Sequence, residues 1–356
     1  MGRRKSAIAE VAGRLASSTG EDFEKLERRL LGVLREQHDE SLQKIFQRIG
    51  RRRRPYCTKL DYYRVERQLL PLLQLGAALS LSPNLVEDYA GAFVEGCALP
   101  AMVVNHWLDG GIEARGTGSR LLLLSSVDAA AAVAALPNSA RVAEVLGTAY
   151  RQTVTGMLDE YHDRWVVPTD QYCRDVVERL ADLSTMRYYR SPCVYFTAVV
   201  CGLVEIAGID SAAFLPATHA FGVASQLADE VTVLAEGIAK GLVTYSVLSV
   251  FDQEIADSLR RIWVGAESST DLVASKRVSV GVGNALEAAG RWQSAGEQRF
   301  AGLRKRYPFV PALLPFIHWQ RGRLARLRAN PHDPHLGDYR HLPPLAAIEA
   351  VAAPPE

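Results

Sequence analysis

Apolar side chains recur every three to four positions through most of this chain, which is the spacing of one face of an α-helix. Residues 20–49 illustrate the pattern, because Phe23, Leu26, Leu30 and Leu34 fall on one such face. Alternating patterns typical of β-strands are nearly absent. The periodicity predicts further helices at 60–80, 85–108, 127–136, 139–165, 171–189, 192–207, 211–236, 240–262, 270–302 and 311–328. The expected fold class is therefore all-α.

Short connections rich in proline and glycine separate these helices, and no long linker divides the chain. We therefore expect one domain over residues 20–329, preceded by an N-terminal extension at residues 1–19. Residues 330–356 are rich in proline and histidine, which is typical of an irregular tail. The tail histidines are interpreted as part of a flexible segment and not as metal ligands; they are His332, His335 and His341.

Composition narrows the class of protein. Of the 356 residues, 48% are hydrophobic, so the chain can bury a large core. The formal charge of +1 gives no general attraction to nucleic acid. The five cysteines show no CxxC spacing, which favours free thiols in a reducing cytoplasm. No segment offers 18 or more uncharged apolar residues, so we expect no membrane span.

Two groups of polar residues interrupt apolar helices. Asn105, His106 and Asp109 lie at the end of the helix expected at 85–108. Side chains four positions apart share a helix face, so Asn105 and Asp109 can hold one divalent metal ion. Alternatively, Asn105 and His106 simply cap the helix. Asp229 and Glu230 stand within a second apolar helix, where unpaired acids are costly to bury, so a metal or cationic partner is favoured.

Three segments together resemble a known family. They are GRRRRP at 50–55, VEGCALPAMVVNHWLDGGIEARG at 94–116 and FGVASQLADEVTVLAEGIAKGLVTYS at 221–246. Their order and spacing are similar to the GKRxRP, DDxxD and QxxDDxxD segments of the trans-polyprenyl diphosphate synthases, which have the class I isoprenoid synthase fold. The resemblance covers roughly residues 20–330. It implies a bundle of long helices around a central pocket, with metal-binding acids on two facing helices, and a homodimer.

The resemblance also implies a chemistry and a set of residues. The expected cofactor is Mg2+, and the expected substrate is an allylic prenyl diphosphate (geranyl, farnesyl or geranylgeranyl diphosphate) that loses its pyrophosphate. The acids of the first motif fall on Asn105, His106 and Asp109, and those of the second on Asp229, Glu230 and Val233. Catalytic roles are thereby expected for Asp109, Asp229 and Glu230. Diphosphate contacts are expected for Arg51, Arg52 and Arg115, although the GRRRRP run also reads as a solvated basic turn.

The sequence departs from the family at several phosphate contacts. Ala98, Ser184 and Leu242 stand where the family has a histidine and two lysines. Terpene synthases share the fold and place metal ligands on one helix face, with an arginine upstream and an Arg-Tyr pair downstream. Here Asp229, Thr232 and Glu236 lie at i, i+3 and i+7, and Arg187 lies upstream. Arg306-Tyr307 lies downstream but reads better as a charged helix end, and Arg187 reads equally well as a helix surface.

The predicted metal ligands are Asn105, Asp109, Asp229, Thr232 and Glu236, and the predicted diphosphate contacts are Arg51, Arg52, Arg115 and Arg187. Because the losses concentrate on groups that hold a second diphosphate, we expect a non-canonical terpene synthase, or prenyl transfer to an acceptor other than isopentenyl diphosphate. Two alternatives stay open. One is a chain-elongating prenyltransferase, and the other is a catalytically silent partner subunit of a prenyl synthase.

Overall fold

The computed structural model describes residues 2–15, 21–53, 59–108, 119–178 and 193–331. Within these ranges every regular element is a helix, which confirms the all-α prediction. The elements are, in chain order, α1 (Gly2–Leu15), α2 (Glu21–Arg53), α3 (Lys59–Ala78), α4 (Pro83–Phe93), the π-helix η2 (Val94–Ala98), α5 (Leu99–Leu108), α6 (Ser119–Ala134), α7 (Ser139–Asp163), α8 (Asp170–Glu178), α9 (Cys193–Ile206), η7 (Ser211–Ala213), α10 (Leu215–Thr232), α11 (Leu234–Ala239), α12 (Tyr245–Leu248), α13 (Gln253–Trp263), α14 (Ser269–Ala274), α15 (Lys276–Leu303), η8 (Val310–Leu313) and α16 (Leu314–Ala329).

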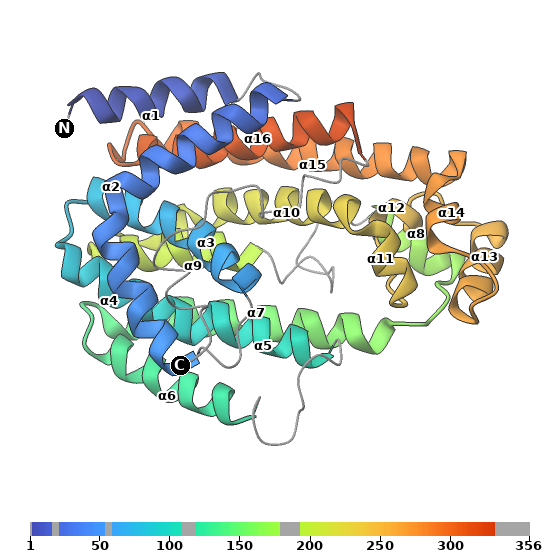
Figure 1. Ribbon diagram of the computed structural model, residues 1–356, viewed down its shortest axis with the longest axis horizontal. Helices are drawn as coiled ribbons and strands as arrows, with labels where there is room; N and C mark the ends of the chain where they lie inside the picture. Colours follow the sequence, from blue (N-terminus) through green and yellow to red (C-terminus); the bar gives the residue numbers. More distant parts are fainter. Residues whose placement is uncertain (1, 16–20, 54–58, 109–118, 179–192, 332–356) are drawn as a thin grey trace.

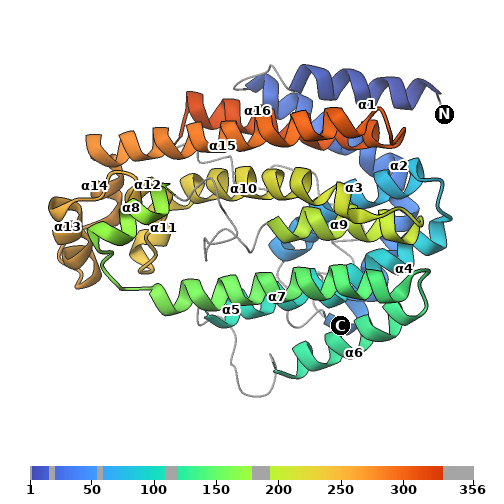
Figure 2. The same cartoon turned by 180° about the vertical axis from the view of Figure 1, so that it is seen from behind.

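Helix α10 runs through the middle of a layered bundle. It packs against α9 and α15, and α7 packs against the other side of α9. One layer contains α1, α15 and α16, and the opposite layer contains α5, α6 and α7 (Figures 1 and 2). The short helices α8 and α11 to α14 gather at one end of the bundle, where they share a second apolar core. No helix in the described ranges is long and apolar enough to cross a bilayer.

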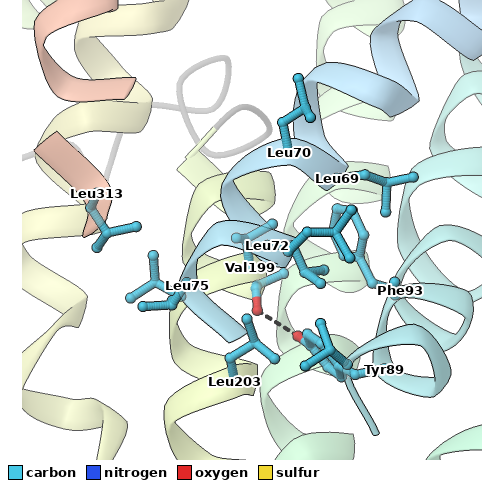
Figure 3. Packing of buried hydrophobic residues seen from close by; sticks show 14 of the residues in the cluster. Leu69, Leu70, Leu72, Leu75, Tyr89, Phe93, Val199, Leu203 and Leu313 are labelled. Carbon is cyan, nitrogen blue, oxygen red and sulfur yellow. Dashed lines mark hydrogen bonds between the residues drawn. The ribbon is translucent and has the colours of Figure 1, made fainter. Parts of the chain in front are cut away.

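The main core is held in register by a buried tyrosine. The hydroxyl of Tyr89 on α4 donates to the carbonyl oxygen of Ala198 on α9, at 2.5 Å (Figure 3). Burying a hydroxyl without such a partner is costly, so this bond fixes how the two helices meet. A Cβ atom on Gly202 would lie 1.8 Å from the tyrosine oxygen, so only glycine permits this approach. Leucines from α3, including Leu72 and Leu75, pack around the same point (Figure 3).

The helix predicted at 85–108 is found as α4, η2 and α5 in succession. Ser82 caps its start by accepting a hydrogen bond from the N–H of Leu85, and Pro83 occupies the first turn, where its missing N–H costs nothing. A single π-helical turn at Val94–Ala98 then inserts an extra residue into the hydrogen-bond ladder. Such turns rotate the face that follows, and they are common beside functional sites.

Helix α1 lies in the stretch that the sequence analysis assigned to an N-terminal extension. Ile8, Val11 and Leu15 are buried in the main core, and α1 packs against α2 and α16. Their spacing of three, four and seven positions is the signal of an amphipathic helix. A Cβ atom on Gly322 of α16 would lie 2.4 Å from the carbonyl oxygen of Leu15, so glycine permits this close contact.

Leu15→Ala should therefore destabilise the whole bundle. The side chain is fully buried, and its truncation leaves a cavity between α1 and α16, so we expect a loss of about 2–5 kcal/mol in the free energy of unfolding. Urea denaturation followed by circular dichroism measures this loss. Gly13→Ala is the matched control, because no atom lies within 4 Å of the added Cβ and stability should not fall. A loss below about 0.5 kcal/mol for Leu15→Ala would mean that α1 does not belong to the cooperative unit.

A buried ion pair joins α2 to α3. The Arg35 Nε atom donates to Glu66 Oε1 at 2.5 Å, and Arg35 Nη2 donates to Glu66 Oε2 at 2.8 Å. Both side chains are buried, at 9% and 2% exposure. Burial raises the pKa of the Glu66 carboxyl by more than the attraction of Arg35 lowers it. The pair therefore sets the register of α2 on α3 more than it adds to stability.

Candidate active site

A cavity of about 570 Å³ opens between the layers of the bundle. Its volume lies within the range of small-molecule sites in proteins, about 300–1,000 Å³. Among the described residues, seven helices contribute to its wall: α2, α3, α5, α7, α9, α10 and α16. The central pocket that the sequence analysis predicted is therefore present. Most of its wall is apolar, and one region of the wall carries polar and charged side chains.

The apolar walls are rich in aromatic rings. Tyr195 and Phe196 come from α9, Phe221 from α10, and Phe316 and Trp319 from α16. The rings of Phe196 and Phe221 pack with their centroids 5.7 Å apart. Aliphatic side chains such as Leu70 and Val199, labelled in Figure 3, complete the surface. Such a wall accepts a hydrocarbon chain, and ring faces attract a positive charge that develops along it.

An ion pair stands in the polar region. The Nη2 atom of Arg323 on α16 donates to Oδ1 of Asp229 on α10, and both residues line the cavity. The Arg323 side chain is 5% exposed, whereas the Asp229 side chain is 48% exposed. The Nε atom of Arg323 is buried and has no hydrogen-bond partner within the described part of the chain. A strongly desolvated cation therefore shares the cavity with a half-exposed carboxylate.

A second arginine is fixed in the cavity wall by an aromatic ring. The guanidinium of Arg67 on α3 lies 4.3 Å from the ring centre of Trp319. The indole N–H of Trp319 donates in turn to Glu27 Oε1, at 2.6 Å. Stacking on an aromatic face orients the guanidinium plane and keeps its charge at the cavity wall. Arg67 and Arg323 thus give the cavity two cations against the single carboxylate of Asp229, among the lining residues.

Two of the predicted metal ligands, Asp229 and Thr232, do line this cavity. Thr232 is the last residue of α10, and its hydroxyl donates to the carbonyl oxygen of Asp229 at 2.7 Å. This bond secures the end of the helix on which both residues lie. The Thr232 oxygen keeps lone pairs for a ligand, but the hydroxyl hydrogen is already used.

The other acids of the second motif lie elsewhere. Glu230 is buried, but it does not line the cavity, since consecutive residues of a helix point about 100° apart. Glu236 was expected on one helical face with Asp229 and Thr232. However, α10 ends at Thr232, Val233 leaves the helical conformation with φ −115° and ψ 16°, and Glu236 belongs to α11. Glu236 forms a surface ion pair with Lys240 at 2.9 Å, so that shared face does not exist.

Three further predicted site residues lie outside the described residues. These are Asp109, Arg115 and Arg187. The backbones of Asn105 and His106 belong to α5, and those of Arg51 and Arg52 belong to the end of α2, but their side chains are not described. The α5 backbone does bring the first motif near the cavity, because Ala101 and Met102, one turn before Asn105, line it.

The donor set can be compared with what a magnesium ion requires. Among the described residues no three His, Cys, Asp or Glu side chains cluster as a metal site, and Asp229 is the carboxylate that lines the cavity. Mg2+ is commonly held by one or two carboxylates together with waters and substrate phosphate oxygens. The half-exposed Asp229 fits as one such ligand, provided that a bound phosphate and water supply the other oxygens.

Sequence reasoning missed the arginines of the cavity. Phe316, Trp319, Gln320 and Arg323 recur at helical spacing along α16, and all four line the cavity. This periodicity was the available signal. It was obscured because α16 also carries Arg321, Arg326 and Arg328, so that Arg323 reads as one more surface charge. Gln226, the first residue of the QxxDD pattern, also lines the cavity.

Comparison with known proteins gives matches at the level of structure. No protein-family model matches the sequence, and no curated protein matches it. A decaprenyl diphosphate synthase from Rhodobacter capsulatus matches 83% of this chain and 99% of its own, with a TM-score of 0.60 and 14% identity. A polyprenyl synthase from Caulobacter crescentus CB15, complexed with calcium and isoprenyl diphosphate, matches 82% of this chain and 97% of its own, with a TM-score of 0.60 and 14% identity.

A geranylgeranyl pyrophosphate synthetase from the archaeon Geoglobus acetivorans is also similar. The match covers 89% of this chain and 99% of that chain, with a TM-score of 0.54 and 14% identity. Identities this low establish the fold and not the reaction. The chain therefore has the all-α fold of the polyprenyl diphosphate synthases over most of its length, as its resemblance to that family implied.

Proposed function

We propose that this protein is a Mg2+-dependent enzyme that binds an allylic prenyl diphosphate in the cavity and releases pyrophosphate from it. One observation carries the proposal. A single cavity combines aromatic walls, suited to a prenyl chain, with a polar region that contains Asp229, Arg67 and Arg323. A ligand with a hydrocarbon tail and a diphosphate head matches that division, and the structural neighbours include a polyprenyl synthase that binds isoprenyl diphosphate.

The proposed reaction begins with ionisation of the substrate. The bond between the allylic carbon and the bridging oxygen breaks, the electron pair leaves with pyrophosphate, and an allylic carbocation stays in the cavity. When bound, Mg2+ supplies positive charge to the leaving group. Arg67 and Arg323 add fixed positive charge, which is most effective where water is excluded. Rings such as Phe196 and Phe221 stabilise the carbocation through their faces.

For the second half of the reaction we propose cyclisation, or transfer to an acceptor other than isopentenyl diphosphate. Support comes from the residues that replace the family's phosphate contacts. Ala98 and Leu242 carry no charge, and neither lines the cavity. Ser184, the third such position, lies outside the described residues. A carbocation that meets no second diphosphate reacts with its own double bonds or with a neutral nucleophile.

Product analysis tests this function. The purified protein is incubated with Mg2+ and geranyl, farnesyl or geranylgeranyl diphosphate, with and without isopentenyl diphosphate, and pyrophosphate and organic products are measured. Hydrocarbon or alcohol formed without isopentenyl diphosphate is the expected result. Longer diphosphates would establish chain elongation instead. Absence of pyrophosphate under every condition would contradict the proposal and favour a silent partner subunit.

The depth of the cavity should set the length of prenyl chain that is accepted. Ala101 on α5 is fully buried and lines the wall, so Ala101→Phe should fill part of the apolar space. We expect kcat/KM for geranylgeranyl diphosphate to fall about tenfold or more, with a smaller change for geranyl diphosphate, since a misfit of this kind in an apolar pocket is worth about 1–3 kcal/mol. Ala130→Phe, on the exposed side of α6, is the control. Equal losses for both substrates would show that Ala101 does not limit chain length.

A further inference from the structure

We infer that Arg323, held in position by Asp229, binds the diphosphate of the ligand directly, so that the head group is held even when no metal ion is present. The inference rests on the proposed function, because it names the protein group that contacts the diphosphate. Arg323 belongs to none of the three segments that resemble the family. Support comes from its burial, from its one hydrogen bond within the described residues and from its place among the other arginines of α16.

Within the described residues, the hydrogen bonding of the buried Arg323 guanidinium is incomplete. A guanidinium has five N–H donors, and within the described part of the chain Arg323 directs one hydrogen bond, from Nη2, to Asp229. Its Nε atom is buried without a partner. Only one side of its charge is compensated, and by a carboxylate that is itself 48% exposed. A guanidinium in this state favours an anion with several oxygens, and phosphate accepts paired hydrogen bonds from arginine.

Arg323 also differs from the neighbouring arginines of α16. Arg321 pairs with Glu297 and Arg328 donates to the carbonyl oxygen of Leu286, at 3.1 Å. Arg326 is buried, but it donates to Glu24 at 2.7 Å and lies against the ring of Phe23. None of these three lines the cavity, whereas Arg323 does. The helix therefore uses the other arginines to attach itself to the bundle and directs Arg323 toward the ligand space.

A second cation lies on the same side of α16. Trp319 precedes Arg323 by four positions, so the two side chains share one face of the helix. Arg67 stacks on Trp319, which places its charge along this face of α16. The lining residues Arg67, Arg323 and Asp229 carry two positive charges and one negative charge. An anion bound in this region would thus meet two cations and one carboxylate among the described lining residues.

Asp229 then has two functions on its two oxygens. Oδ1 accepts from Arg323 and orients the guanidinium, which makes Asp229 a positioning residue for this contact. The rest of the half-exposed carboxylate faces the cavity and is available to a metal ion that arrives with the diphosphate. Metal-free binding should depend on Arg323, whereas turnover should depend on both residues.

Isothermal titration calorimetry of the full chain tests the inference. The probe is the thiolo analogue of farnesyl diphosphate, in which sulfur replaces the bridging oxygen and slows ionisation, measured in EDTA and again in Mg2+. We expect wild-type protein to bind the probe in EDTA, and Arg323→Gln to bind it about ten- to a hundredfold more weakly. Arg321→Gln removes an exposed arginine two positions before Arg323 that does not line the cavity, so this variant should bind like wild type. Asp229→Asn should keep metal-free binding, because the amide oxygen still accepts from Arg323 and one negative charge is removed.

The outcomes separate this inference from the proposed function. Binding in Mg2+ but not in EDTA, or equal metal-free affinity of Arg323→Gln and wild type, would overturn the role of Arg323 and leave the proposed function standing. No binding in either condition would overturn both. Arg323→Lys is the second variant in case glutamine at this buried position prevents folding. Lysine keeps the charge without the paired donors, so intermediate affinity is expected, and wild-type affinity would contradict the paired contact.

Discussion

Asp229→Asn should lower the rate of pyrophosphate release by about two to three orders of magnitude, the range seen when one preorganised electrostatic group is removed from an active site. The substitution keeps the size of the side chain and an oxygen that accepts from Arg323. It removes the negative charge of the carboxylate that lines the cavity. Among the described residues, a bound metal ion would then have no charged ligand in the cavity wall. Steady-state release of pyrophosphate from farnesyl diphosphate, at saturating Mg2+, measures the effect.

Glu236→Gln is the matched control for this experiment. Glu236 belongs to the same stretch of sequence, but it forms a surface pair with Lys240 on α11 and does not line the cavity. Its variant should release pyrophosphate at close to the wild-type rate. If Asp229→Asn keeps more than about a tenth of wild-type activity, Asp229 is not a catalytic residue. A large loss of activity in Glu236→Gln would instead support the predicted metal ligand set of Asp229, Thr232 and Glu236.

The largest effect on stability is expected at the buried ion pair of α2 and α3. Glu66→Leu removes the carboxylate that pairs with Arg35 at 2.5 and 2.8 Å, and leaves a buried guanidinium without it. Breaking one side of such a pair costs about 3–5 kcal/mol. Urea denaturation monitored by circular dichroism should show this loss in the free energy of unfolding, with a lower midpoint concentration of urea.

The double variant Arg35→Met/Glu66→Leu distinguishes the loss of a favourable pair from the cost of a buried charge that has lost its carboxylate. Burial raises the pKa of Glu66 despite the arginine, which indicates that desolvation outweighs the attraction. Replacing both residues by apolar ones of similar size should therefore recover most of the stability that Glu66→Leu loses. If the double variant is as unstable as Glu66→Leu alone, the attraction between Arg35 and Glu66 outweighs their desolvation cost, and the pair itself stabilises the fold.

The architecture of this molecule was largely accessible from its sequence. Helical periodicity identifies the apolar helix that leads through Ala101 to Asn105, and the structure has that helix as α4, η2 and α5. Periodicity is a local property, so it survives without knowledge of tertiary contacts. Periodicity also placed Asp229 and Thr232 on an apolar helix, predicted at 211–236, and the family resemblance implied a central pocket. Both residues line the cavity, although α10 ends at Thr232.

Two features of the site required the tertiary structure. The helix break at Val233 has no proline or glycine to mark it, so Glu236 was assigned to the face of Asp229 although it lies on another helix. Arg323 resembles its neighbours Arg321 and Arg326 in sequence, and only the packing of α16 separates a cavity residue from surface and structural ones. Burial of a charge depends on distant segments, which no local pattern records.

A crystal structure with the thiolo analogue of farnesyl diphosphate and Mg2+ tests the central claim most directly. The claim predicts the diphosphate between Asp229 of α10 and Arg323 of α16, within hydrogen-bond distance of the guanidinium, with the prenyl tail along Phe196 and Phe221. A head group bound away from both residues, or an analogue bound outside this cavity, would contradict the account.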